Sequence, residues 1–272
     1  MIFIRGREIG LGLIAQVAAA ALLGAIQGVT EWLPISSSGH LALAQNFLGL
    51  GAPIAFDALL HLATLLVAVV KFRGDLNSIL GSLLRLDLAS PPAKLGLMVA
   101  VGNIPTLLLG LALRGAFEAM YSDPRAIGLA FLSTGFLLRA SKRPGGNKGV
   151  GYTEAMLIGL SQGLSIAPGA SRSGLTIATA LLLGVERGEA LRFSFLLMMP
   201  AVLGALALEA GGLAVGMGPL EALAGFSAAL IAGYLSLGLL MRSVSEGKFH
   251  LFSHYCWCAG AAALAYSAMI HP

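Results

Sequence analysis

Charged residues are scarce in this sequence. Asp, Glu, Lys and Arg make up only 11% of its 272 residues, hydrophobic residues make up 57%, and the mean hydropathy is +0.86. A soluble domain usually carries about 25% charged residues, so this chain cannot cover itself with a polar surface. The composition excludes an ordinary water-soluble domain and predicts an integral membrane protein.

Cysteine is nearly absent as well. Cys256 and Cys258 are the only two; at this spacing on a helix they point to different faces, and free cysteines usually behave as small buried hydrophobes. No spacing of cysteine and histidine is typical of a structural zinc site. The sequence therefore gives no reason to expect a redox pair or a structural zinc ion.

Two polar stretches interrupt the apolar chain. They are Gln27-Gly-Val-Thr-Glu-Trp-Leu-Pro-Ile-Ser-Ser-Ser-Gly-His40 and Gln162-Gly-Leu-Ser-Ile-Ala-Pro-Gly-Ala-Ser-Arg-Ser-Gly-Leu-Thr176. At a constant offset of 135 residues they match at five positions: Gln27/Gln162, Gly28/Gly163, Ser36/Ser171, Ser38/Ser173 and Gly39/Gly174. We infer a single membrane domain, residues 1–272, built from two repeats over approximately 8–140 and 150–272.

Ten apolar segments can be marked, five in each half, separated by stretches of Gly, Pro and charged residues that indicate loops. They cover residues 11–29, 38–48, 54–70, 95–113, 126–138, 152–164, 173–183, 190–208, 220–240 and 252–270. A helical crossing needs about 20 apolar residues, and the second segment of each half is too short. Together with the first segment it predicts a helical hairpin with the polar stretch at its tip, because irregular backbone at membrane depth is tolerated only inside protein or beside a wet cavity. The predicted fold is all-α, with six spanning helices and two re-entrant helical hairpins.

The basic residues are unevenly divided between the two predicted sides of the membrane. Twelve fall on one side: Lys71, Arg73, Arg85, Lys94, Arg139, Lys142, Arg143, Lys148, Arg187, Arg192, Arg242 and Lys248. Four fall on the other: Arg5, Arg7, Arg114 and Arg125. Because basic residues favour the cytoplasmic side, we expect both termini outside, and we attribute the net charge of +4 to membrane orientation, with no nucleic-acid partner. An odd number of segments per half gives the halves opposite orientations, which is an inverted repeat.

The N-terminal run of apolar residues follows Arg5 and Arg7, as a cleaved signal peptide would. It leads directly into the first polar stretch. We therefore expect this segment to be retained in the folded protein.

Arg172 is the one basic residue that lies neither in a terminus nor beside a connecting loop. A charge at membrane depth costs from about 2.5 to over ~10 kcal/mol, so it requires an internal acid or a function. Hydroxyl groups surround it at Ser171, Ser173 and Thr176. A predicted helix also begins here, and its free N–H groups and dipole attract phosphate. An anion-binding role is favoured over simple packing against an acid.

The first polar stretch supplies complementary groups. Glu31 is the matching acid, and His40 is the histidine nearest to it in sequence. A second helix start rich in hydroxyls is formed by Ser36, Ser37 and Ser38 with Gly39. Helix capping explains any one of these serines but not the whole set. A carboxylate, an imidazole, a hydroxyl and the Arg172 guanidinium in one cavity are the groups that phosphoryl transfer requires.

Asp57 and His61 are four residues apart on another predicted helix, so they share a face. This spacing favours a simple pair at the helix end, with a supporting role beside the site as the alternative.

Three motifs carry a family resemblance: Gln27-x-x-x-Glu31 with Leu-Pro-Ile-Ser-Ser-Ser-Gly-His40, Pro168-Gly-Ala-Ser-Arg-Ser-Gly-Leu-Thr176, and Arg192-Phe-Ser-Phe-Leu-Leu197. They resemble the bacterial undecaprenyl pyrophosphate phosphatase family, also called the bacitracin-resistance protein family, over almost the whole chain. The resemblance implies a multi-pass enzyme of the bacterial plasma membrane that removes the terminal phosphate of undecaprenyl pyrophosphate. The product, undecaprenyl phosphate, is the lipid carrier recycled in peptidoglycan synthesis.

The resemblance also implies a divalent cation, Mg²⁺ or Ca²⁺, and an active site that opens to the outer face. Its partners are the polyprenyl diphosphate substrate and membrane lipid, and a homodimer is left open. The family's catalytic positions are occupied by Glu31, Ser37, His40 and Arg172. Its substrate-binding positions are occupied by Gln27, Ser36, Ser38, Ser171, Ser173 and Thr176.

Gln27 departs from the family pattern, because many members have Glu there. An amide oxygen can coordinate a hard cation, but it carries less charge than a carboxylate. We therefore expect Glu31 to contribute most to any metal binding, with Gln27 as a weaker ligand.

For the reaction, we expect Ser37 to be the nucleophile, with Glu31 or His40 accepting its proton. A phosphohistidine at His40 and direct attack by an activated water stay open as alternatives. Inverted repeats and broken helices are also typical of transporters, so a polyprenyl-phosphate flippase is the rival function. A carrier needs no nucleophile, which favours the enzyme.

Overall fold

The computed structural model describes residues 12–48, 54–142, 146–209 and 218–270. Arg5, Arg7 and Arg143, which were used above to orient the chain, lie outside these ranges. Within them the chain is helical and contains no strand, and an isolated bridge joins Lys148 to Val185. The predicted all-α fold is confirmed.

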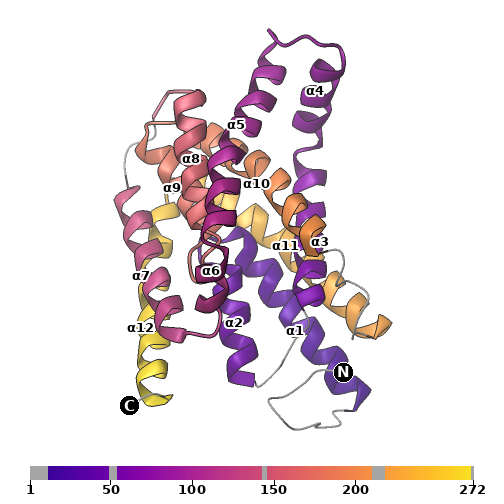
Figure 1. Cartoon of the computed structure of the whole chain (residues 1–272), viewed down its shortest axis with the longest axis vertical. Helices are drawn as coiled ribbons and strands as arrows, with labels where there is room; N and C mark the ends of the chain where they lie inside the picture. The colour runs from indigo at the N-terminus through magenta and orange to yellow at the C-terminus, as the bar shows by residue number, and fades with distance from the viewer. Residues whose placement is uncertain (1–11, 49–53, 143–145, 210–217, 271–272) are drawn as a thin grey trace.

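The helices follow one another in the order shown in Figure 1. They are α1 (Leu13–Trp32), α2 (Ser37–Leu48), α3 (Ile54–Lys71), α4 (Arg73–Leu84), α5 (Pro91–Ala112), α6 (Arg114–Met120), α7 (Pro124–Ala140), α8 (Tyr152–Leu164), α9 (Arg172–Leu182), α10 (Arg187–Glu209), α11 (Pro219–Ser245), the 3₁₀ helix η2 (Phe249–Leu251) and α12 (Phe252–Ile270).

Each of the ten predicted apolar segments corresponds to one of these helices, and their starts follow local rules. α5 begins with Pro91 after Ser90, and α7 begins with Pro124 after Asp123. Proline is favoured at the first helical position because its missing N–H is not needed there. The Asp123 side chain also accepts a hydrogen bond from the Arg125 N–H, as a good N-cap does.

Two helices and η2 lie in stretches that the sequence assigned to connections. α4 carries charged and polar residues along its length, and α6 is only 7 residues long. Neither forms an apolar segment, so hydrophobic runs alone could not reveal them.

Four of the described helices are long and apolar enough to cross a membrane: Leu13–Trp32, Pro91–Ala112, Arg187–Ala207 and Pro219–Ser245. α1 is among them, although the sequence placed it in a hairpin. α2 and α9, with 12 and 11 residues, fall well short of the ~20 residues that a crossing needs.

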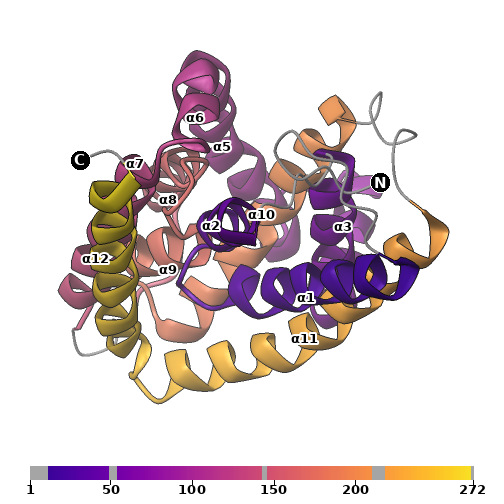
Figure 2. The same ribbon diagram turned by 90° about the horizontal axis from the view of Figure 1, so that it is seen from below.

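Three pairs of neighbouring helices form the frame. α1 lies alongside α11, α5 alongside α8, and α7 alongside α12; Figure 2 shows the first and the last of these pairs. Glycine allows two of the close approaches. A Cβ added to Gly24 of α1 would overlap the Gly225 carbonyl of α11, and one added to Gly159 of α8 would overlap the Gly102 carbonyl of α5. Small residues commonly let helices approach in this way within membranes.

The main core surrounds α10. Its Phe193, Phe195 and Leu197 side chains are fully buried. Trp32, at the C-terminal end of α1, packs edge-on against Phe195 with 5.2 Å between ring centroids. Phe195, which belongs to the Arg192-to-Leu197 motif, thus holds Trp32 and the end of α1 in place. Trp32 directly follows Glu31 in the sequence.

Candidate active site

The first polar stretch forms the connection between α1 and α2. α1 ends before Pro34, where the preceding residue takes an extended conformation that suits proline. Ser36 has a positive φ of 67°, which is uncommon for a residue with a side chain. Its Oγ accepts a hydrogen bond from the Gly39 N–H at 3.2 Å and so caps the start of α2.

The second polar stretch has the same design between α8 and α9. Gly169 has a φ of +91°, and an added Cβ would overlap the Ile127 carbonyl of α7. Ser171 caps α9, because its Oγ accepts from the Gly174 N–H at 3.1 Å. Ser36 and Ser171 are thus equivalent caps of two equivalent helices.

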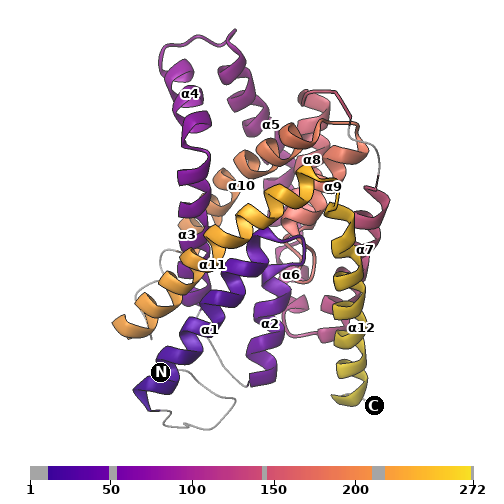
Figure 3. The same ribbon diagram turned by 180° about the vertical axis from the view of Figure 1, so that it is seen from behind.

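The two connections touch each other inside the protein. The Gly169 N–H donates to Ser36 Oγ at 3.1 Å, and Ser173 Oγ donates to the Leu33 carbonyl at 3.3 Å. Figure 3 shows α1 and α2 coming from the lower part of the molecule and α8 and α9 from the upper part. Thr134 of α7 adds support by accepting from the Ser171 N–H at 3.2 Å. This threonine carried no signal in the sequence.

Glu31 is the centre of the polar contacts. Its Oε2 accepts hydrogen bonds from Ser37 Oγ at 2.6 Å and from Gln27 Nε2 at 2.9 Å, while its Oε1 lies 3.0 Å from Arg172 Nη1. The structure therefore brings together four of the predicted residues, from both halves of the chain. Arg172 forms an ion pair with Glu31, the acid that the sequence analysis matched to it.

Burial differs across this ion pair. The Glu31 side chain is 4% exposed, whereas that of Arg172 is 28% exposed. The bond to Glu31 engages Nη1 of a guanidinium that has five N–H donors. Arg172 can thus neutralise the buried carboxylate and still present donors to an anion on its open side.

His61 of α3 is the histidine that approaches this carboxylate, with Nε2 3.7 Å from Glu31 Oε2. Its Nδ1 hydrogen-bonds the Asp57 backbone carbonyl at 2.8 Å, and the Asp57 carboxylate instead accepts from Gln45 of α2. His61 thus contacts Asp57 through the backbone carbonyl. The less favoured of the two interpretations, a supporting role for His61 beside the site, agrees with this geometry.

His40 contacts different partners. Its Nδ1 lies 2.7 Å from the Ser36 carbonyl and its Nε2 lies 2.6 Å from the hydroxyl of Tyr255 on α12. Sequence proximity suggested His40 as a neighbour of Glu31, but α2 turns its imidazole toward α12.

The remaining predicted substrate-binding hydroxyls are paired within the protein. Ser38 lies near Ser36, with 3.4 Å between their Oγ atoms, and Ser173 lies near Ser171 at 3.3 Å. Thr176 is fully buried, donates to the Arg172 carbonyl at 2.8 Å and contacts the Ser194 hydroxyl of α10. These groups shape the two helix starts, where unpaired N–H groups favour phosphate.

The oxygen atoms next to Glu31 determine whether a divalent cation fits. Among the described residues, no three His, Cys, Asp or Glu side chains come together. Gln27 Oε1, however, is buried without a hydrogen-bond partner beside the carboxylate. Mg²⁺ is commonly held by one or two carboxylates together with substrate phosphates. The donor set fits a hard cation bound jointly with a phosphate ligand.

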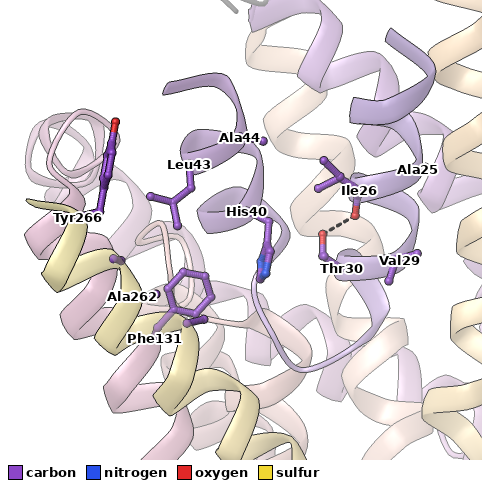
Figure 4. A pocket seen from close by; sticks show the side chains of 12 residues that line it. Ala25, Ile26, Val29, Thr30, His40, Leu43, Ala44, Phe131, Ala262 and Tyr266 are labelled. Carbon is purple, nitrogen blue, oxygen red and sulfur yellow. Dashed lines mark hydrogen bonds between the residues drawn. The ribbon is translucent and has the colours of Figure 1, made fainter. Parts of the chain in front are cut away.

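A cavity of 680 Å³ lies next to the first connection, between α1, α2, α7 and α12. Figure 4 shows the His40 ring reaching it from α2, with Phe131 and Tyr266 on the facing side. Thr30 is a polar residue in its wall, and its hydroxyl donates to the Ile26 carbonyl at 2.6 Å. The lining residues are Ala25, Ile26, Val29, Thr30, His40, Leu43, Ala44, Phe131, Ala259, Ala262, Ala263 and Tyr266. The cavity is thus largely apolar and suits a hydrocarbon chain.

Phosphoryl transfer requires a nucleophile, a base and a fixed positive charge at one point. Ser37, Glu31 and Arg172 meet these requirements within hydrogen-bonding distance. A largely apolar cavity, whose lining includes Thr30 and His40 of the first polar stretch, has room for an apolar chain. The class of protein that this fold and site define is a membrane-embedded phosphoryl-transfer enzyme for a lipid-like substrate.

Comparison with known proteins identifies the family of this chain. It belongs to the bacitracin resistance protein BacA family, which it matches over residues 20–262. An undecaprenyl-diphosphatase of Korarchaeum cryptofilum is 40% identical over 263 residues, covering 92% of this chain and 99% of that protein. One of Desulfosudis oleivorans is 41% identical over 262 residues, covering 89% and 96%. The resemblance inferred from the three motifs is confirmed.

Proposed function

We propose that this protein is an undecaprenyl-diphosphatase. It hydrolyses undecaprenyl pyrophosphate to undecaprenyl phosphate and inorganic phosphate, which recycles the lipid carrier for peptidoglycan synthesis and confers bacitracin resistance. The observation that carries the proposal is the convergence of Ser37 and Arg172, from different halves, on the buried carboxylate of Glu31. Membership of the BacA family and the names of the relatives support the same reaction.

The diphosphate is placed between the starts of α2 and α9. There the Arg172 guanidinium and the N–H groups of both helix starts neutralise its charge. The polyprenyl chain extends along the apolar cavity. His40, which lines this cavity, lies three residues after Ser37 on α2.

In the first chemical step, Ser37 Oγ attacks the terminal phosphorus while its proton passes to Glu31 Oε2, 2.6 Å away. The bond between this phosphorus and the bridging oxygen breaks, and undecaprenyl phosphate leaves. In the second step, a water molecule attacks the phosphoserine, the bond between phosphorus and Ser37 Oγ breaks, and the proton that water loses leaves with the inorganic phosphate. Glu31 Oε2 returns its proton to Ser37 Oγ, which restores both groups for the next turnover. Arg172 is positioned to stabilise the negative charge in both steps.

The alternative nucleophile, His40, is less well placed. Both of its ring nitrogens already lie within hydrogen-bonding distance of protein partners, the Ser36 carbonyl and the Tyr255 hydroxyl. Ser37, in contrast, already contacts its base. The geometry favours a phosphoserine over a phosphohistidine, and labelling the enzyme with a substrate carrying ³²P in its terminal phosphate tests this directly. A labelled adduct that persists in Ser37→Ala would reject the serine.

The cofactor in this proposal is Mg²⁺ or Ca²⁺, held by Glu31 with Gln27 Oε1 as the weaker ligand. When bound, the cation adds positive charge that stabilises the phosphate oxygens. Ser37 and Arg172 keep the roles given above.

We further propose a plasma-membrane arrangement with six spanning helices, α3, α5, α7, α10, α11 and α12, and with α1–α2 and α8–α9 as re-entrant hairpins in an inverted repeat. The meeting of both hairpin tips in the buried interior supports it. In Figure 1 the start of α1 and the end of α12 lie at the end of the molecule opposite α4, which supports termini on one side of the membrane. The positive-inside rule then assigns that side to the exterior, and the family resemblance implies that the active site opens to the same side. A homodimer is left open.

The proposed function is tested by phosphate release from undecaprenyl pyrophosphate in detergent, with EDTA and with added Mg²⁺ or Ca²⁺. We expect cation-dependent release that Glu31→Gln and Arg172→Ala each lower by at least about 100-fold, as removal of a key electrostatic group does. A carrier would instead need sealed vesicles to show its activity. Folded wild-type protein that binds the lipid but releases no phosphate would replace the enzyme with the flippase.

A further inference from the structure

Tyr255 belongs to neither polar stretch, yet it contacts His40 in two ways. Its hydroxyl lies 2.6 Å from His40 Nε2, and the two rings are stacked with 5.6 Å between centroids and 19° between planes. The contact joins α12, at the end of the second half, to the beginning of α2.

The partners of His40 determine where its proton lies. The Ser36 carbonyl can only accept, so Nδ1, 2.7 Å away, carries a hydrogen. In the neutral ring Nε2 is then the acceptor, and the Tyr255 hydroxyl donates to it. Phe131 packs edge-on against the same imidazole at 5.3 Å between centroids. The orientation of the ring and the position of its proton are therefore both fixed by neighbours.

His40 passes this constraint to the first connection. Its Nδ1–H holds the carbonyl of Ser36, whose backbone has the unusual positive φ. Ser36 Oγ in turn accepts from the N–H groups of Gly39 and Gly169. A continuous series of hydrogen bonds thus runs from α12 through His40 to the point where both connections meet.

A second contact from α12 reaches the same place. Cys256, the residue after Tyr255, is buried, and its Sγ donates to the Pro34 carbonyl at 3.3 Å. Two consecutive residues of α12 therefore hold the backbone on either side of Ile35.

We propose that Tyr255 is a positioning residue for the hydrolysis: through His40 it keeps Ser36 in the conformation that directs Ser37 toward Glu31 and joins the two connections. The inference rests on the proposed phosphatase function. Ser37 follows Ser36 directly, so a change at Ser36 alters the direction of the nucleophile.

The matched test is Tyr255→Phe, which keeps the stacked ring and removes only the hydroxyl. Loss of this hydrogen bond should lower kcat by roughly 2- to 13-fold, which corresponds to about 0.5–1.5 kcal/mol. KM for undecaprenyl pyrophosphate should stay within about twofold, because the diphosphate contacts are untouched. Tyr234→Phe, at an exposed position on α11, is the control and should match the wild type.

The contact itself has a readout that needs no turnover. In protein labelled with ¹⁵N-histidine, the His40 signals are those lost in His40→Gln. They should show a proton on Nδ1 and a hydrogen-bonded Nε2, and Tyr255→Phe should shift the Nε2 signal while Tyr234→Phe does not.

Unchanged His40 signals in Tyr255→Phe would overturn the contact, and an unchanged kcat would overturn the positioning role. A wild type that releases no phosphate would refute the proposed function and this catalytic role with it, and the spectra would still decide whether the Tyr255–His40 contact exists.

Discussion

Gly24 and Gly159 lie 135 residues apart and make the same kind of contact in opposite halves of the protein. Gly24 on α1 faces Gly225 on α11, while Gly159 on α8 faces Gly102 on α5. The offset is the one that relates the two polar stretches. The correspondence between the halves thus extends from their motifs to their helix packing, which supports the predicted repeat.

These crossings should be sensitive to a single methyl group. Because the added Cβ of Gly24→Ala or Gly159→Ala would overlap a backbone carbonyl, each change should destabilise the protein by about 1–3 kcal/mol, as overpacking does. Gly238→Ala is the control, since a Cβ there meets no atom within 4 Å. Thermal unfolding in one detergent compares the three. A Gly159→Ala protein as stable as Gly238→Ala would contradict the close approach of α8 and α5.

Removing only Arg172 from its ion pair with Glu31 should destabilise the protein more than removing both charges. Arg172→Met leaves a carboxylate that is 4% exposed without its cation. Breaking a buried pair costs about 3–5 kcal/mol, and we expect the lower end because Arg172 is 28% exposed. Adding Glu31→Gln should restore much of the loss in denaturation experiments without restoring activity. A double variant less stable than Arg172→Met would show that the unpaired charge is not the cause.

The unpartnered Oε1 of Gln27 leads to a prediction about the cation. Gln27→Glu places a second carboxylate beside Glu31, which should lower the Mg²⁺ or Ca²⁺ concentration needed for half-maximal activity by about tenfold, since affinity rises with ligand charge. Bound cation should also raise the unfolding temperature of the variant more than that of the wild type. Choline chloride at equal ionic strength is the control. Equal cation responses in both proteins would remove Gln27 from the metal site.

The apolar cavity should determine how the enzyme treats long lipids. Ala262→Trp places a large side chain in its wall, so KM for undecaprenyl pyrophosphate should rise by about tenfold while a short-chain prenyl diphosphate is affected less. Ala261→Trp, an exposed neighbour that is not part of the lining, is the matched control. Identical KM values for the two variants would place the polyprenyl chain elsewhere.

The sequence predicted most of the fold because each main helix is an apolar run bounded by Gly, Pro or charge. α4 was missed because charged and polar residues interrupt its apolar ones, and α6 because it is so short. The predicted re-entrant placement of α1 does not follow from its composition, since its 20 residues are apolar enough for a crossing. Its position depends on the contact between Trp32 and Phe195, which are far apart in the sequence.

For the active site, the charged residues of the two polar stretches were the most informative feature of the sequence. A lone arginine at membrane depth requires an acid, and Glu31 was the acid in the matching stretch; their 3.0 Å contact agrees with that reasoning. Distance along the chain was a poor guide for histidine, because His40 turns toward Tyr255 while His61, thirty positions after Glu31, approaches the carboxylate. Tyr255 and Thr134 lie on helices that carry neither motif, so their roles depend on tertiary packing alone.

Equivalent positions of the two halves have acquired different chemistry. Ser37 corresponds to Arg172 at the 135-residue offset, and Glu31 corresponds to Ile166. The proposed nucleophile and the arginine therefore occupy equivalent positions of the two polar stretches, and both contact an acid that the second stretch lacks. A symmetric dimer of the first half would contain two copies of Ser37 and Glu31 but no arginine at this position. A symmetric dimer of the second half would contain two copies of Arg172 but no acid at the position that matches Glu31. In the predicted repeat, two copies within one chain can differ at such positions, so that matching helix starts surround a single asymmetric site.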